Sequence, residues 1–294
     1  MPKKMDAINR PLRAQLNLIA AAMVVGAGMA GPAHAFVIDT GNPDWQLRWD
    51  NTVRMNYVHR VESQDKDILQ QVNADDGNRN FDKGMVSARL DLLSEADLVY
   101  KRNHGVRVSA AAWYDRGYDR SLDHDNLPSS NHVNSGGGQG IGLANSTKRY
   151  YRGPSGEILD AFAFTRIELG GVNTDIRAGR HVVYWGESLM GNGVLHGITY
   201  AQSGLDLAKA AAIPGTEAKE LFRPLNQISL QMRPSSELSI ALQYFLEWEP
   251  FRIPEAGSYL GTTDMLLDGG ESLIAGGNRF LRGHDVEPDD RGEW

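Results

Sequence analysis

Charged side chains that recur at every second position are the residues of this sequence whose types and spacing could do chemistry. They alternate with apolar residues in several segments, so one side of each segment is charged and the other is apolar. If the charged sides face water, their opposite charges create a transverse field that orders water and sorts small polar solutes. A plainer interpretation is that these charges satisfy one another and keep an interior wet. The residues predicted to line this space are Arg48, Arg54, Arg89, Asp91, Glu95, Asp97, Arg107, Arg166, Glu168 and Arg177.

Arg180, His181 and Glu187 form a second candidate cluster, a constriction beside a long loop. Strict alternation places Arg180 on the apolar side, where an arginine at the midplane of a bilayer costs about 2 to 4 kcal/mol. Either a bulge at Gly179 turns Arg180 inward and completes the cluster, or the segment has reached the membrane interface at this point.

Motifs for catalysis and metal binding are weak. The stretch "GESLMG" lacks the glycine two residues after Ser188 that a nucleophile elbow requires, and a triad of Ser188, His196 and Asp206 needs a proximity that one sequence does not show. The acidic segments 75–82 and 119–126 could hold calcium, but their spacings do not match an EF-hand and acidic loops are usually solvated. We therefore assign no catalytic residue, cofactor or metal ligand, and we expect no enzyme.

Seven alternating segments position the charged residues, and each is predicted to be a β-strand. They are residues 44–60, 86–100, 106–118, 160–169, 175–185, 225–232 and 238–248. An ordinary strand has about five or six residues, but the first segment keeps its period for about sixteen, with Trp45, Trp49 and Tyr57 on its apolar side. At about 3.3 Å per residue and a tilt of about 40°, the path from Trp45 to Tyr57 rises roughly 30 Å, which matches an apolar membrane band with its aromatic girdles.

The spacers between these strands alternate in length. Residues 101–105, 170–173 and 233–237 are short turns, whereas 62–84, 120–157, 186–224 and 250–291 are long loops. Outer-membrane barrels have short periplasmic turns and long extracellular loops, and nothing in a soluble sandwich requires this alternation. The third long loop contains "LDLAKAAA" and "TEAKELF", which have helical character. By analogy, such a loop folds into a barrel and narrows it.

The two ends of the chain have different characters. Residues 1–35 have a basic start, an apolar run and the sequence "AHA", and so predict a cleaved signal peptide before Phe36. Residues 36–294 are then the N-terminal part of a barrel, with about seven strands and, at Trp294, the start of an eighth. Because bacterial single-chain barrels have even strand numbers, we expect a piece of a longer barrel or a truncated gene product.

Composition excludes some classes of function. Removal of the signal peptide takes away four basic residues and one acid, which moves the formal charge from −7 to −10 and makes nucleic-acid binding a poor expectation. The chain has no cysteine, so disulfides and thiolate chemistry are excluded.

Longer stretches resemble a proteobacterial outer-membrane family, the domain-of-unknown-function 1302 family. They are "AGRHVVYWGES", "GLDLAKAAAIPGTEAKELFRPLNQISL", "LQYFLEWEPFRIPEAGSYLGTTDML" and the final "EPDDRGEW". Family members usually have Gln where this sequence has His181. The resemblance covers nearly all of the mature chain and about the first half of a typical member. It implies a large β-barrel with a transport role and no established substrate.

The sequence therefore predicts an all-β fold, a transmembrane antiparallel β-barrel of the outer-membrane type that is incomplete in this chain. We expect a porin-like channel in the outer membrane of a Gram-negative bacterium. Its expected partners are outer-membrane lipid, a small solute of unknown identity and a periplasmic or envelope export partner. Two alternatives stay open: a lipid-modifying barrel enzyme that uses Ser188, and a soluble secreted β protein used for binding.

Overall fold

The computed structural model describes residues 36–184 and 204–287 of the chain. Contacts divide the chain into two units, Met1–Phe36 and Val37–Trp294, and the described elements belong to the second apart from Phe36. The predicted signal peptide and the expected strand start at Trp294 lie outside the described residues.

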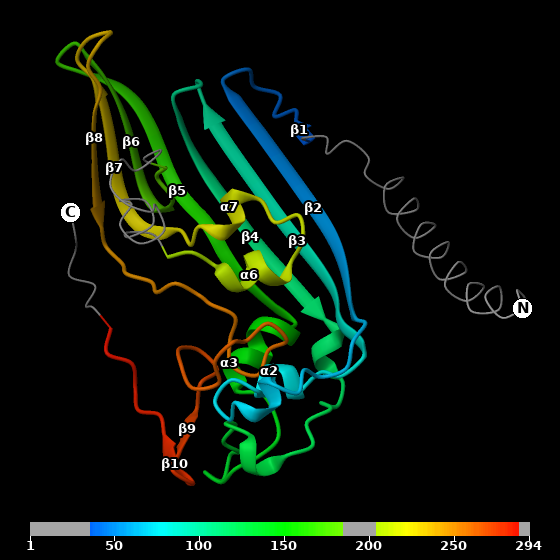
Figure 1. Cartoon of the computed structure of the whole chain (residues 1–294). Helices are drawn as coiled ribbons and strands as arrows, with labels where there is room; N and C mark the ends of the chain where they lie inside the picture. The colour runs from blue at the N-terminus through cyan, green and yellow to red at the C-terminus, as the bar shows by residue number, and fades with distance from the viewer. Residues whose placement is uncertain (1–35, 185–203, 288–294) are drawn as a thin grey trace, which may run out of the picture. The chain divides into compact units, whose positions relative to one another are not determined.

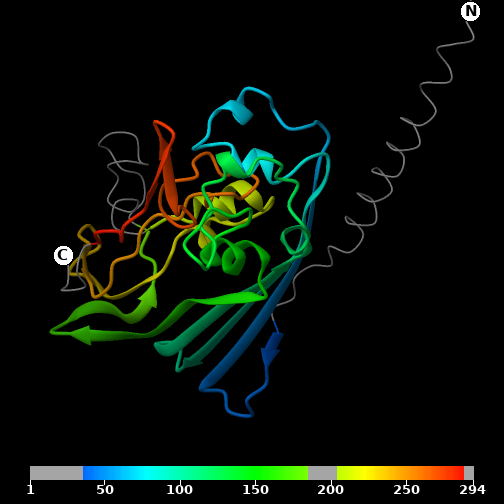
Figure 2. The same cartoon turned by 90° about the horizontal axis from the view of Figure 1, so that it is seen from below.

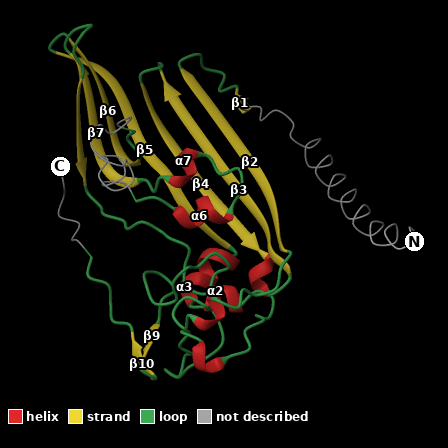
Figure 3. Ribbon diagram, in the orientation of Figure 1, coloured by secondary structure: helices red, strands yellow, loops and turns green. Residues whose placement is uncertain are grey.

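The largest sheet of the second unit is antiparallel and has eight strands that neighbour one another in chain order (Figure 1, Figure 3). The strands are β1 (Phe36–Ile38), β2 (Trp45–Arg60), β3 (Gly84–Tyr100), β4 (His104–Asp115), β5 (Ser155–Leu169), β6 (Val172–His181), β7 (Leu225–Arg233) and β8 (Ile240–Phe245). Strands β2 to β8 correspond one by one to the seven predicted strands. The antiparallel all-β class is therefore confirmed.

Strand register gathers the charged residues on one face of the sheet and the apolar residues on the other. Across β2 and β3, Arg54 lies directly opposite Asp91. The apolar face is the exposed one, since Met55 is 83% and Val53 67% exposed. The charged face curves around other parts of the chain, and Arg89 on it is only 4% exposed (Figure 2). In a water-soluble sheet the apolar face is normally the buried one, so this sheet has the inverse polarity.

A bulge explains why β5 begins earlier than its alternation predicts. The register between β4 and β5 shifts between Val108 and Ala110. An extra residue in a strand reverses which positions, odd or even, face each side of the sheet. As a result, Glu157 on one side of the bulge and Asp160 on the other both lie on the charged face.

Other strand ends also differ from the prediction. Strand β4 ends at Asp115 and not at residue 118, because the Asp115 carboxylate accepts a hydrogen bond from the Gly117 N–H (2.8 Å) and begins the short helix η2 (Arg116–Asp119). Strand β8 covers only six residues of its predicted range, and β6 ends at His181, before residue 185.

Short turns join the strands at one end of the sheet and long loops join them at the other (Figure 1). Gly170 and Gly171 form a two-residue hairpin turn with φ of 58° and 83°. Positive φ at both positions is what a type I′ turn requires, and glycine adopts it without steric cost. The predicted alternation of short and long connections is confirmed for the described residues.

The long loops pack on one another and carry most of the buried apolar residues. We call residues 61–83, 116–154, 204–224 and 246–287 the loop body, and β2–β8 the strand wall. The loop body contains η1 (Ile68–Gln70), α2 (Asp76–Arg79), η2, η3 (Leu127–Ser129), α3 (Asn145–Thr147), η4 (Lys148–Arg152), α6 (Leu207–Ala212), α7 (Ala218–Leu221) and the hairpin β9 (Ser272–Ala275) with β10 (Asn278–Leu281). Its largest core cluster joins loop residues to the ends of β3 and β4: Phe81, Val86, Trp113, Tyr118, Leu143, Tyr150, Tyr151 and Ala208.

Helices α6 and α7 lie against the charged face of the sheet, as Figure 1 and Figure 2 both show. They correspond to the two helical stretches predicted in the third long loop. Glu220 of α7 contacts Arg54 of β2, and Lys219 contacts Glu95 of β3. The third loop therefore covers the middle of the charged face.

Candidate functional site

A cavity of about 870 Å³ lies on the charged face of the strand wall. Strands β3 to β8 and helix α7 contribute its lining. Five of the ten residues predicted to face a water-filled space line it, together with His181. These five are Glu95, Asp97, Arg107, Arg166 and Arg177.

Arg107 is the centre of an ion-pair cluster in this cavity. Its guanidinium lies 2.5 Å from Glu95, 2.9 Å from Asp97 and 3.2 Å from Asp160. Lys219 approaches Glu95 to 2.8 Å from the opposite side. Three acids and two bases are thus held together, because the register places Arg107 opposite Asp97 and the bulge in β5 turns Asp160 toward it.

A second charged group lies nearer the short turns. Arg166 and Asp175 are direct partners across β5 and β6, and their side chains approach to 2.6 Å. Arg177 lies over the ring of Phe162, with 5.8 Å between the guanidinium carbon and the ring centroid. Phe162 and Phe164 alternate in step with Asp160 and Arg166 along β5, and both line the cavity. This part of the cavity lining thus offers a solute both charged groups and aromatic rings.

His181 is held in one orientation at the long-loop end of β6. Its Nδ1 lies 2.9 Å from the Gly179 carbonyl oxygen and its Nε2 lies 2.8 Å from Ser229 Oγ. A carbonyl oxygen only accepts, so Nδ1 carries the proton, and in the neutral ring Nε2 accepts from the Ser229 hydroxyl. The backbone requires glycine at position 179, because its φ is +120° and a Cβ there would lie 2.4 Å from the Ala161 carbonyl oxygen of the neighbouring strand.

Arg180 does not join His181. The register of β6 with both neighbours runs through Gly179 without a shift, which excludes the bulge, the first of the two alternatives, and leaves Arg180 on the apolar face. It lies at the strand end, 2.5 Å from Glu247 and 3.6 Å from Glu249. Glu187, the third member of the predicted constriction cluster, lies outside the described residues.

The remaining predicted residues lie on the charged parity but outside the cavity lining. Arg54 forms a two-pronged bond with Glu220 of α7 (2.9 and 3.2 Å). Arg89 is buried against the Trp113 ring and pairs with Asp91 at 2.9 Å.

Two of these residues lie closer to the short turns. Arg48 pairs with Asp50 at 2.7 Å and is largely exposed. Glu168 is exposed near the end of β5. Their positions fit a solvated rim better than a binding site.

Asp206, Tyr150 and Arg252 form a buried network that the sequence did not predict. The Asp206 carboxylate accepts hydrogen bonds from Tyr150 Oη (2.6 Å), Arg252 (2.6 Å) and the Lys209 N–H (2.8 Å). Burial, with Asp206 beside it, raises the pKa of Tyr150 well above its usual value. Because these residues are 46 to 56 positions from Asp206, no local motif signals the network, which fixes α6 over the charged face.

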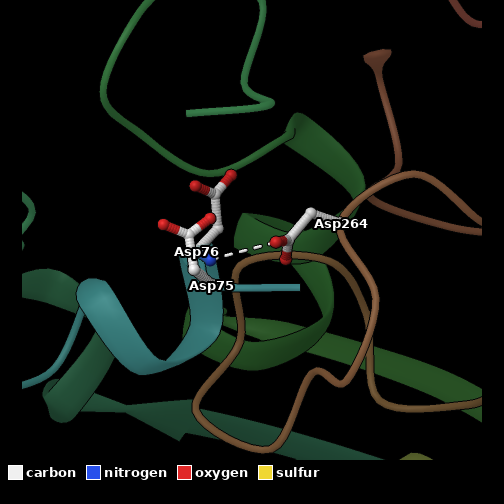
Figure 4. Close-up of side chains that lie close together, drawn as sticks. All are labelled: Asp75, Asp76 and Asp264. Atoms are coloured by element: carbon white, nitrogen blue, oxygen red, sulfur yellow. Dashed lines mark hydrogen bonds between the residues drawn. The ribbon is translucent and has the colours of Figure 1, made fainter. Parts of the chain in front are cut away.

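The residues that could hold a metal ion lie in the loop body, away from this cavity. Asp75, Asp76 and Asp264 are all buried and each brings one carboxylate oxygen to within 4.8 Å of the others (Figure 4). Burial, with Asp76 next, raises the pKa of Asp264 to about 7. The sequence prediction included Asp75 and Asp76 in an acidic segment, but it gave no reason to add Asp264.

Comparisons with known proteins give one match. No curated protein and no solved structure matches the chain. Within the described residues, no helix has the length and apolar character that crossing a membrane requires. A family model described as "Protein of unknown function (DUF1302)" matches residues 16–294, nearly the whole sequence. With its long antiparallel strands and charged cavity, the chain belongs to this family of unknown function.

Proposed function

We propose that this protein is an outer-membrane β-barrel, part of whose wall is formed by β2–β8, and that it acts as a porin-like channel for small solutes. The observation that carries the proposal is the inverse polarity of the sheet. Its apolar face is exposed, and its charged face surrounds a cavity and carries ion pairs.

Lipid is the surrounding that suits the apolar face. Exposed aliphatic side chains, among them Val53, Met55 and Ile228, run along it. At the short-turn end, the tilted rings of Trp45 and Tyr100 contact one another with 4.7 Å between their centroids, and Tyr57 and Tyr114 lie exposed toward the other end. Aromatic girdles of this kind mark the two interfaces of membrane barrels.

A water-filled lumen suits the charged face. The lining carries both signs of charge, so it favours small solutes with polar groups, and Phe162 and Phe164 add contacts for moderately apolar ones. Helices α6 and α7 narrow the path, since Arg54–Glu220 and Glu95–Lys219 tie α7 to the wall.

The alternative functions receive less support from the described residues. Asp206 of the imagined triad is engaged by Tyr150 and Arg252, while Ser188 and His196 lie outside the described residues. A soluble binding protein would need a second layer over the apolar face. In residues 36–184 and 204–287, the second sheet is the β9–β10 hairpin, which is attached to the loop body.

Membrane fractionation and conductance test the proposal. The protein is expected in the outer-membrane fraction, extractable only with detergent and migrating faster on gels when unheated. The folded protein in planar bilayers is then expected to give discrete conductance steps. Recovery as a detergent-independent periplasmic protein would overturn the membrane assignment, and a folded, inserted barrel that never conducts would overturn the channel.

A further inference from the structure

Three aspartates from distant parts of the chain meet inside the loop body. Asp75 and Asp76 lie at the start of α2 in the first long loop, and Asp264 lies in the fourth, with its Oδ2 accepting the Asp76 N–H at 3.0 Å (Figure 4). Asp75 and Asp264 are 0% exposed and Asp76 is 4% exposed. Three carboxylates in such a place would repel one another strongly unless a positive charge lies among them.

Two oxygens of this cluster have no hydrogen-bond partner among the described residues. They are Asp75 Oδ1 and Asp264 Oδ1, both shielded from solvent. A buried carboxylate oxygen without a donor is costly, and in native proteins such an atom usually faces a water or an ion. This is independent of the proximity of the three carboxylates, and it points to a bound group.

Protein charges neutralise the cluster only in part. Arg79 lies 2.8 Å from Asp75, but it also pairs with the exposed Asp125 at 2.7 Å. His124 Nε2 lies 3.0 Å from Asp76 Oδ1, and the Asn131 N–H donates to Asp76 Oδ2 at 2.9 Å. One arginine against three carboxylates leaves a formal charge of −2. One divalent cation would neutralise this charge.

We propose that Asp75, Asp76 and Asp264 bind one divalent cation of the calcium type. Carboxylate oxygens are the ligands of hard cations, and oxygens 4.8 Å apart can lie on opposite sides of an ion that binds oxygen at about 2.4 Å. Calcium takes six to eight oxygens in flexible geometry, so carboxylates in two-oxygen contacts and water complete the set. Asn131, whose buried Oδ1 also has no hydrogen-bond partner among the described residues, is a further source of oxygen.

The cation would fasten three long loops together. His124 and Asn131, which contact Asp76, come from the second loop, so the site joins the first, second and fourth loops at one point. Next to it, the Asn73 side chain binds both the N–H and the carbonyl oxygen of Ile274 in β9 (2.9 and 2.8 Å). The position of the hairpin β9–β10 thus depends on a residue next to the proposed cation site.

Calcium binding tests the proposal. The purified, folded protein is first treated with a chelator, and its binding of calcium is then measured. Calorimetric titration with CaCl2 is expected to show one ion per chain, and calcium is expected to slow proteolysis of the loops. Asp264→Asn, which keeps the shape of the side chain, is expected to weaken binding about tenfold or more. Asp268→Asn removes the same charge from an exposed position in the same loop and is expected to bind like the wild type.

A second measurement separates a cation site from aspartates that merely share protons. Without calcium, Asp264→Asn removes repulsion and is expected to be at least as stable as the wild type, whereas with calcium only the wild type gains stability. A wild-type protein that binds no calcium, or equal losses of affinity in Asp264→Asn and Asp268→Asn, would overturn the proposal. If Asp264→Asn fails to fold, the titration of the wild type decides alone.

Discussion

The strand wall and the loop body bury opposite kinds of side chain. The wall exposes Val53 and Met55 and covers Arg89, whereas the loop body buries Phe81 and Leu143 as an ordinary protein interior does. The strand wall therefore exposes apolar side chains and the loop body buries them. This difference is expected if lipid surrounds the wall and water surrounds the loops. Ion pairs connect the two regions: the wall's charged face is the side on which α6 and α7 dock.

The largest expected effect comes from breaking the network that fixes α6 in the loop body. Asp206→Ala leaves Arg252 buried without its closest carboxylate, and removing one partner of a buried pair costs about 3 to 5 kcal/mol. Limited proteolysis is expected to cut the third loop quickly while circular dichroism still shows the strands. Asp67→Ala, at an exposed loop position, is the control. Loss of the strands as well would mean that the wall depends on the loop body.

A charge on the apolar face tests the wall itself. Ile228→Arg places a cation among exposed apolar residues of β7, and in a bilayer this is expected to cost about 2 to 4 kcal/mol. The matched control is Gln231→Arg on the charged face of the same strand, opposite Asp175. Insertion into lipid vesicles, measured by heat-modifiable migration, is expected to fall only for Ile228→Arg. Equal insertion of the two variants would argue against lipid on that face.

The pH dependence of the loop body sharpens the comparison further. Burial raises the pKa of Glu255 to about 7 from its ordinary value of 4.5. Between these values the unfolded chain loses this proton and the folded chain keeps it, so stability falls as the pH rises and the full penalty is present above pH 7.

Glu255→Gln removes this penalty. The variant is expected to be about 2 to 3 kcal/mol more stable than the wild type at pH 8 and no more stable at pH 4. Hydrogen exchange of loop amides at several pH values measures the difference. A stability difference that does not change between pH 4 and pH 8 would contradict the assignment.

The smallest expected effect is on the contact between the two regions. Glu220→Gln weakens the bond to Arg54 by about 1 to 2 kcal/mol, so α7 leaves the charged face more often and the conductance of single channels is expected to rise. Glu168→Gln makes the same change at an exposed position near a strand end and is expected to conduct like the wild type. Unchanged conductance in Glu220→Gln would show that α7 does not limit the path.

The alternation of apolar and polar residues was enough to predict the strands of the wall. Each strand has one side in an apolar and one side in a polar environment, so every residue type along it carries information. The alternation placed Arg54 and Asp91 on the same charged side, and the register then sets them directly opposite one another. It failed where parity changes, since the bulge near Asp160 hid the first half of β5, and it left open whether a bulge at Gly179 turns Arg180 inward, which the register excludes.

The loop body was less predictable, because its contacts join residues far apart in sequence. The acidic segment 75–82 was noticed, yet Asp264 completes the cluster from 188 positions away and carries no local signal. For the same reason Asp206 was considered for catalysis, whereas its actual neighbours Tyr150 and Arg252 were not identified. The alternation of polar and apolar residues indicates the environment of each residue. The contact partners of a residue in an irregular loop become known only from the folded structure.

The spacing of these contacts also sets an order of assembly. Strands β2 to β8 pair with their neighbours in the chain, so each strand pair of the wall forms from segments that follow one another in sequence. The loop body has to wait, because Asn80 binds Gly257 and Asn73 binds Ile274 across 177 and 201 positions. Distant contacts form late because loop closure must come first. The fourth long loop therefore seals the first loop, which precedes it by some two hundred positions, and a chain cut before residue 246 would carry a paired wall beneath open loops.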